Sequence, residues 1–147
     1  MLLFVAVALL SACAAAPPRT VVFVCEHGAA KSVLAAAYLN RMADERGLAV
    51  RAVARGADPQ PNPSARTVEG LRADGLPAPA VPPEPLTASD VRAAARLVVF
   101  DCREPTMVAL SRMGACWDDV PAVGDGYPRA RDGIRARVDG LLAELSR

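Results

Sequence analysis

Lysine is almost absent from this 147-residue sequence, and neither sign of charge is in large excess. Lys31 is the only lysine, the formal net charge is +1, and arginines are scattered among aspartates and glutamates. The chain therefore lacks the polybasic segment typical of nucleic-acid binding, and we expect its charges to form a solvated surface with no nucleic-acid partner. The length suits one domain with a good core and is too short for two ordinary domains.

The apolar run over residues 1–16 is shorter than the roughly 20 residues that a membrane-spanning helix needs. It ends in small residues, as secretory signals do, and the sequence LSAC at residues 10–13 resembles a bacterial lipobox. We therefore expect a signal and tether over residues 1–19, with Cys13 lipidated. The domain of residues 20–147 would then lie on the periplasmic side of a bacterial membrane, held there only by its lipid. No Lys or Arg precedes the run, so the alternative is a misplaced start codon and a cytoplasmic domain beginning near Arg19.

Residues 21–32 contain the most informative pattern of the sequence. Four apolar residues, mostly β-branched, predict a strand buried on both faces, and a loop with Gly28 and two alanines follows. A helix that begins near Lys31 would point its free N–H groups at this loop, which favours anion binding. Cys25 lies at the entrance of the loop, where these donors would favour the nucleophilic thiolate.

Cys25, five further residues, Lys31 and Ser32 resemble the Cys-x5-Arg-Ser/Thr motif of one superfamily. It comprises the low-molecular-weight protein tyrosine phosphatases and the thioredoxin-coupled arsenate reductases. The resemblance implies that Cys25 attacks phosphorus or arsenic, that Ser32 hydrogen-bonds the cysteine, and that Lys31 replaces the arginine that grips the oxygens. It also implies a loop that holds the oxyanion, formed by Glu26, His27, Gly28, Ala29, Ala30 and Lys31.

Two loop positions depart from the family motif. The ammonium of Lys31 is a point charge and does not offer the two-pronged contact of a guanidinium. Gly28 stands where the family usually has Asn, which helps to shape the loop. His27 either assists Cys25 as a base or proton donor, or simply faces water.

Hydrolysis of a phosphate monoester also needs an acid that protonates the leaving oxygen. The family supplies an Asp just before a Pro in a late loop, whereas here Val120 precedes Pro121. Asp119 lies one position earlier and is the predicted acid, with Asp118 and Asp125 as further candidates.

Three cysteines besides Cys13 cannot all pair within one chain. Cys102 matches the position of a redox cysteine in the arsenate reductases, but Ala109 lies near the place of its partner and Cys116 comes well after it. The alternative interpretation makes Cys102 a small buried residue, and Cys116 beside Trp117 is predicted to belong to the core.

Strand and helix patterns alternate along the rest of the chain. The predicted strands are residues 21–24, 48–53, 97–100 and 115–117, and the predicted helices are residues 32–46, 64–75, 87–95, 104–113 and 131–145. A proline-rich extended segment is predicted at residues 76–85, and Asp101 and Cys102 are expected near the Cys25 loop. We find no internal repeat. The alternation predicts an α/β fold in three layers, a four-stranded parallel sheet with helices on both faces, and the resemblance implies the phosphotyrosine protein phosphatase I-like fold.

The sequence therefore predicts a hydrolase acting on a phosphorylated protein or small phosphate ester through a phosphocysteine, without a metal or cofactor. Two alternatives stay open. One is an oxyanion-binding lipoprotein module with little or no turnover, and the other is thiol redox chemistry of the arsenate reductase kind.

Overall fold

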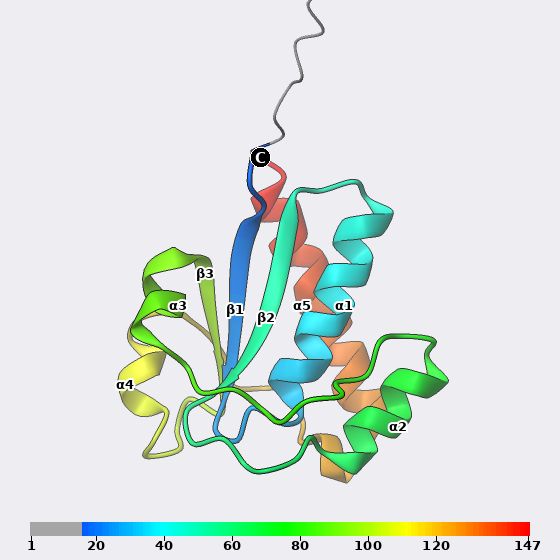
Figure 1. Cartoon of the computed structure of the whole chain (residues 1–147), viewed down its shortest axis with the longest axis vertical. Helices are drawn as coiled ribbons and strands as arrows, with labels where there is room; N and C mark the ends of the chain where they lie inside the picture. The colour runs from blue at the N-terminus through cyan, green and yellow to red at the C-terminus, as the bar shows by residue number, and fades with distance from the viewer. Residues whose placement is uncertain (1–15) are drawn as a thin grey trace, which may run out of the picture.

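Four parallel strands form the centre of the structure, a computed structural model in which residues 16–147 are described (Figure 1). The sheet has the order β2-β1-β3-β4. Its strands are β1 (Arg19–Cys25), β2 (Val50–Gly56), β3 (Ala94–Phe100) and β4 (Ala115–Trp117). The predicted α/β class and the four-stranded parallel sheet are confirmed, whereas the predicted lipobox with Cys13 lies outside the described residues.

Helices cover both faces of the sheet, as predicted (Figure 1). One side carries the two longest helices, α1 (Lys31–Glu45) and α5 (Tyr127–Leu145), together with α2 (Ala65–Ala73). The other carries two short helices, α3 (Ala88–Ala93) and α4 (Val108–Ser111). A short 3-10 turn, η1 (Val123–Asp125), precedes α5. No helix among residues 16–147 is long and apolar enough to cross a membrane.

Side chains of β1 alternate between the two cores, because successive strand residues point to opposite faces. Phe23 packs with Phe100 and Trp117 on the side of α1 and α5, with ring centroids 5.5–6.2 Å apart. Val24 belongs to the smaller core on the side of α4, which also contains the fully buried Met107. Cys25 continues the first series and therefore lies on the same side of the sheet as α1.

The outer edge of β2 is closed by side chains and by the proline-rich segment. Asn40 of α1 pairs with Ala52 through both its amide oxygen and its amide nitrogen, at 2.8 and 3.1 Å. Further along, Gly56 donates to the carbonyl of Glu84 and accepts from the N–H of Leu86. This edge strand is thus kept from pairing with another chain, and the end of β2 is fixed beside the Cys25 loop.

Several predicted boundaries were wrong in detail. The helix predicted for residues 87–95 ends at Ala93, and β3 begins directly at Ala94. The helix predicted for residues 104–113 is reduced to α4, because the preceding residues turn to bury Met107. The last helix begins at Tyr127, four residues earlier than predicted, with Pro128 in its first turn.

Candidate active site

The carboxyl ends of the four strands meet at one edge of the sheet, and the predicted site residues gather there. β1 ends at Cys25, β3 is followed by Asp101, and β4 is followed by Asp118. The loop of residues 26–30 then leads from Cys25 into α1. Parallel pairing alone brings these segments together, and ligands of open α/β sheets bind at this edge.

Cys25 is buried and is the only unpaired cysteine among the described residues. Its Sγ lies 3.1 Å from the Oγ of Ser32, which is fully buried in the first turn of α1. The family resemblance implied this contact. A hydroxyl at this distance donates to a thiolate and stabilises it without adding a charge.

The loop between Cys25 and Lys31 is held from behind by the segment that follows β2. The carbonyls of Cys25, Glu26, His27 and Ala29 accept hydrogen bonds from N–H groups of residues 57, 58, 60 and 64, at 2.7–3.3 Å. A trans peptide carries its C=O and N–H on opposite sides. The N–H groups of residues 26, 27, 28 and 30 therefore point away from the supporting segment, which leaves them free to donate to an anion.

Gly28 makes this close support possible. Its φ is +64°, in the left-handed region that favours glycine, and a Cβ built there would lie 2.8 Å from the backbone nitrogen of Gly56. An Asn like that of the family does not fit this backbone, so the loop takes its shape from contact between two glycines.

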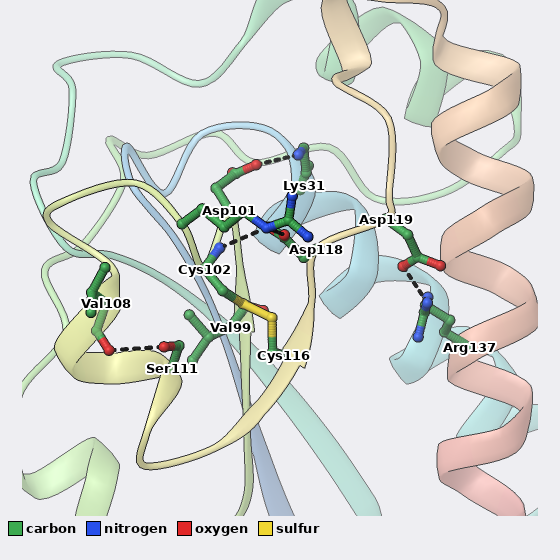
Figure 2. Close-up of a disulfide and its surroundings, with 11 residues drawn as sticks. Lys31, Val99, Asp101, Cys102, Val108, Ser111, Cys116, Asp118, Asp119 and Arg137 are labelled. Carbon is green, nitrogen blue, oxygen red and sulfur yellow. Dashed lines mark hydrogen bonds and ion pairs between the residues drawn. A yellow bond between two sulfur atoms is a disulfide. The ribbon is translucent and has the colours of Figure 1, made fainter.

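Lys31 is engaged with a carboxylate from the neighbouring strand. Its Nζ lies 2.5 Å from Oδ1 of Asp101, and the lysine side chain is only 11% exposed (Figure 2). The sequence placed Asp101 near the loop, and this placement is confirmed. The ion pair itself was not predicted, because the two residues are 70 positions apart.

Two other charged residues of the loop have partners at its rim. His27 lies 3.2 Å from the carbonyl of Asp58 through Nδ1 and 3.7 Å from Glu26 through Nε2. Glu26 also accepts a hydrogen bond from Thr106. These contacts hold the Glu26 carboxylate at the rim of the loop.

The three candidate acids lie in different surroundings. Asp118 accepts the N–H of Cys102 at 3.1 Å and pairs with Arg103 at 2.7 Å. Asp119 is 69% exposed and pairs with Arg137 of α5, whose hydrogen bond lowers the pKa of Asp119 below its ordinary value (Figure 2). Asp125 is exposed, and Val120 is buried.

Cys102 and Cys116 form a disulfide, which corrects the prediction of a core cysteine at position 116 (Figure 2). Cys102 is buried as one interpretation expected, but Cys116 is exposed, and the bond ties the end of β3 to β4. The disulfide thus fixes the segment that carries Asp118.

The family model of the low molecular weight phosphotyrosine protein phosphatases matches residues 20–116. The chain belongs to this family. None of the curated proteins matches the chain in sequence. Several solved structures share the fold of this phosphatase-family chain, although their sequences are only distantly similar to it.

A mutant of YwlE from Bacillus subtilis is 21% identical over 88% of this chain and 99% of its own, with a TM-score of 0.75. YfkJ from Bacillus subtilis is 18% identical over 89% of this chain and 96% of its own, with a TM-score of 0.74. A thioredoxin-dependent arsenate reductase from Corynebacterium glutamicum is 24% identical over 90% of this chain and 65% of its own, with a TM-score of 0.72. These structures therefore share the fold of this chain, and one of them is a thioredoxin-dependent arsenate reductase.

Proposed function

We propose that this chain hydrolyses phosphate monoesters through a phosphocysteine formed on Cys25. The observation that supports this proposal most strongly is the buried thiol, 3.1 Å from the Ser32 hydroxyl, at the entrance of a loop whose N–H groups are free. The sulfur attacks phosphorus in line with the leaving oxygen, the ester P–O bond breaks, and water then releases phosphate and the thiolate.

The loop N–H groups and Lys31 hold the phosphoryl oxygens during this reaction. Loop donors that are fixed from behind need no rearrangement as charge develops, which makes them effective stabilisers of the transition state. Lys31 adds a positive charge but only a monodentate contact, so we expect slower turnover than with arginine at this position. Ser32 keeps the sulfur available as a thiolate and as a leaving group in the second step.

The nucleophilic role of Cys25 does not identify the acid that protonates the leaving oxygen. The prediction that Asp119 protonates the leaving oxygen stays a prediction, and its pairing with Arg137 does not favour it because the pair stabilises the unprotonated form. His27 stays a candidate for proton transfer, although its Nδ1 faces the carbonyl of Asp58. Nucleophilic attack by Cys25 does not depend on either assignment.

The substrate class is a phosphorylated protein or a small phosphate ester. One structure similar to this chain is an arginine phosphatase from Geobacillus stearothermophilus, with 19% identity and a TM-score of 0.69. A phosphotyrosine peptide, which is a phosphate ester, and a phosphoarginine peptide, whose phosphoryl group is held by a P–N bond, therefore both serve as test substrates. The ratio of the two hydrolysis rates selects the substrate class.

The steady-state test compares the full-length chain with its Cys25→Ser variant on p-nitrophenyl phosphate. The wild type is expected to release nitrophenol and the variant to release none, while phosphate still binds the variant because the loop is unchanged. Activity that survives Cys25→Ser would remove this residue from the mechanism. Phosphate protection of Cys25 from alkylation, without turnover, would favour the oxyanion-binding module instead.

Thiol redox chemistry is the second candidate, because a disulfide lies at the end of β3 beside the Cys25 edge. In this scheme Cys25 binds arsenate, a reduced Cys102 attacks the Cys25 sulfur to release arsenite, and Cys116 then resolves the Cys25–Cys102 bond. The product is the Cys102–Cys116 disulfide, which an external dithiol must reduce. Arsenate-dependent oxidation of a dithiol that is lost in Cys116→Ser would support this candidate.

For the location we propose, from the sequence alone, lipid attachment at Cys13 on the periplasmic side of a bacterial membrane. Fractionation of cells that express the full chain or its Cys13→Ala variant tests this. Membrane association of the wild type alone supports the lipid anchor, whereas equal solubility of both supports the cytoplasmic alternative.

A further inference from the structure

Cys116 and Asp118 lie on the same side of the end of β4. Trp117, which stands between them in the sequence, packs against Phe23 in the core on the side of α1 and α5. Because successive residues of an extended chain point to opposite faces, Cys116 and Asp118 point to the other side of the sheet. Cys102 belongs to the smaller core on that side. The end of β4 therefore presents a sulfur and a carboxylate to the region that contains Cys102.

The turn after β3 brings Cys102 close to these two residues. Asp101 has a φ of +54°, and no other non-glycine residue among residues 16–147 has a positive φ. The N–H of the next residue, Cys102, donates to Oδ1 of Asp118 at 3.1 Å, and the Cα atoms of Cys102 and Cys116 are 6.1 Å apart. As a result, the two sulfurs and a carboxylate oxygen of Asp118 lie within 4.8 Å of one another (Figure 2).

Hydrogen bonds fix the Asp118 carboxylate beside the two sulfurs. Oδ1 accepts the N–H of Cys102, and Oδ2 pairs with Nε of Arg103 at 2.7 Å. Carboxylates that bind metal ions commonly carry such outer hydrogen bonds, which orient them toward the metal. The Arg103 side chain is 91% exposed, so it can move into solvent without disturbing the core. A carboxylate adds nothing to a disulfide bond, whereas it completes a set of three metal ligands.

We propose that Cys102, Cys116 and Asp118 bind a zinc ion when the disulfide is reduced, with water as the fourth ligand. An external dithiol supplies two electrons and two protons, which convert the disulfide into two thiols, and the dithiol itself becomes oxidised to a disulfide. Zinc then replaces the two thiol protons, which pass to the solvent. This site goes beyond the proposed phosphatase function and does not involve Cys25.

The ligand types favour zinc over harder cations. Two thiolates and one carboxylate suit Zn²⁺, whereas Mg²⁺ and Ca²⁺ prefer oxygen ligands throughout. In a tetrahedral zinc site two thiolate sulfurs are about 3.8 Å apart. Side-chain rotation can reach this separation from Cα atoms 6.1 Å apart. Cys116 is exposed, which gives the ion a path from solvent. Because the same two sulfurs form the disulfide, the oxidised protein has no such site.

The test uses the full-length chain with Cys13→Ala and Cys25→Ser, in which Cys102 and Cys116 are the remaining cysteines. This protein is reduced with a phosphine, which competes less for metal than a dithiol does, and is titrated with Co²⁺ without oxygen. We expect one Co²⁺ per chain, with thiolate-to-cobalt absorption and the visible bands of tetrahedral Co²⁺. Zinc should then displace the cobalt. The same protein with its disulfide intact should show neither absorption.

Two carboxylate variants test the third ligand while both cysteines are kept. Asp118→Asn is expected to weaken zinc binding by at least about tenfold. Asp119→Asn is the matched control, because it changes the neighbouring carboxylate, which pairs with Arg137 instead. Its zinc affinity should equal that of the parent protein. Zinc should also protect both thiols of the parent protein from iodoacetamide, a result that mass spectrometry of the peptides measures without a cysteine substitution.

Three results would overturn the assignment. Reduced protein without cobalt absorption and without zinc protection of its thiols would exclude the site. Equal zinc affinity in Asp118→Asn and Asp119→Asn would remove the carboxylate from the ligand set. Equal metal binding before and after reduction would show that the ion binds elsewhere on the chain.

Discussion

Gly28 and Gly56 lie back to back, with no room for a side chain between the anion loop and the end of β2. A Cβ at Gly28 would come within 2.8 Å of the Gly56 nitrogen, and one at Gly56 within 2.9 Å of the Gly28 nitrogen. The atoms that would collide are backbone atoms, which cannot rotate away as a flexible side chain can. This contact therefore sets the position of the N–H groups that face the anion.

Gly28→Ala is expected to disturb the loop on two grounds, the backbone clash and the positive φ. The strain alone is on the order of 1–3 kcal/mol, so we expect phosphate affinity and turnover to fall by at least tenfold. Protection of Cys25 from alkylation by phosphate measures the affinity without requiring turnover. Gly133→Ala is the control, since no atom lies within 4 Å of its added Cβ. Unchanged protection in Gly28→Ala would mean that the loop adapts freely.

Lys31→Arg restores the arginine of the family motif. A guanidinium contacts two phosphoryl oxygens at once, and one added charge-assisted hydrogen bond is worth about 1.5 kcal/mol or more. We expect kcat/KM for aryl phosphates to rise roughly tenfold. A decrease would show that the space between Lys31 and Asp101 fits only an ammonium.

The Cys102–Cys116 bond closes a short loop, because the two cysteines are 14 positions apart in the sequence. A loop of this size is expected to contribute about 3 kcal/mol through the entropy of the unfolded chain. The double variant Cys102→Ser/Cys116→Ser should therefore lose about this much free energy of unfolding in urea. Treatment of the wild type with a reducing agent should lower its free energy of unfolding by a similar amount. Equal stability of the oxidised and the reduced protein would show that the disulfide does not stabilise the fold.

Arg55 of β2 holds Asp90 of α3 through two hydrogen bonds, 3.0 and 3.2 Å long. These bonds lower the pKa of Asp90 from 3.8 to about 2. A carboxyl whose pKa is lower in the folded state stabilises the protein above its unfolded pKa, and this stabilisation is lost as the pH falls from about 4 to about 2. Asp90→Asn should thus destabilise the protein at pH 7, by about 1–3 kcal/mol.

Urea unfolding of Asp90→Asn and the wild type at pH 7 and near pH 2 checks this dependence. The difference in free energy of unfolding between the two proteins should shrink at the lower pH, where Asp90 of the wild type is largely protonated. A constant difference across this range would show that the Asp90 charge does not matter for stability.

The sequence predicted those parts of the fold and site that local patterns determine. The apolar run before Cys25 and the periodic apolar residues of α1 identify a strand and a helix, and the loop between them follows. The Cys25–Ser32 contact was implied because both residues belong to one short motif. The course of residues 104–107 was missed because burial of Met107, a tertiary contact, overrides the local preference for helix.

Local sequence patterns did not predict which side chains of distant segments pair with each other. The Lys31–Asp101 ion pair depends on the register of β1 against β3, and that register appears only when the sheet is assembled. The Cys102–Cys116 bond depends on β4 lying beside β3. Three cysteines in a sequence are compatible with several pairings, so their number alone did not identify this one.

The central claim is that Cys25 becomes covalently phosphorylated during turnover. Rapid acid quenching of the full-length chain with p-nitrophenyl phosphate, followed by mass spectrometry of its peptides, measures this directly. The account predicts a phosphoryl group on Cys25 in the wild type, and none in Cys25→Ala. Turnover by the wild type without any phosphorylated Cys25, or turnover by Cys25→Ala, would contradict it.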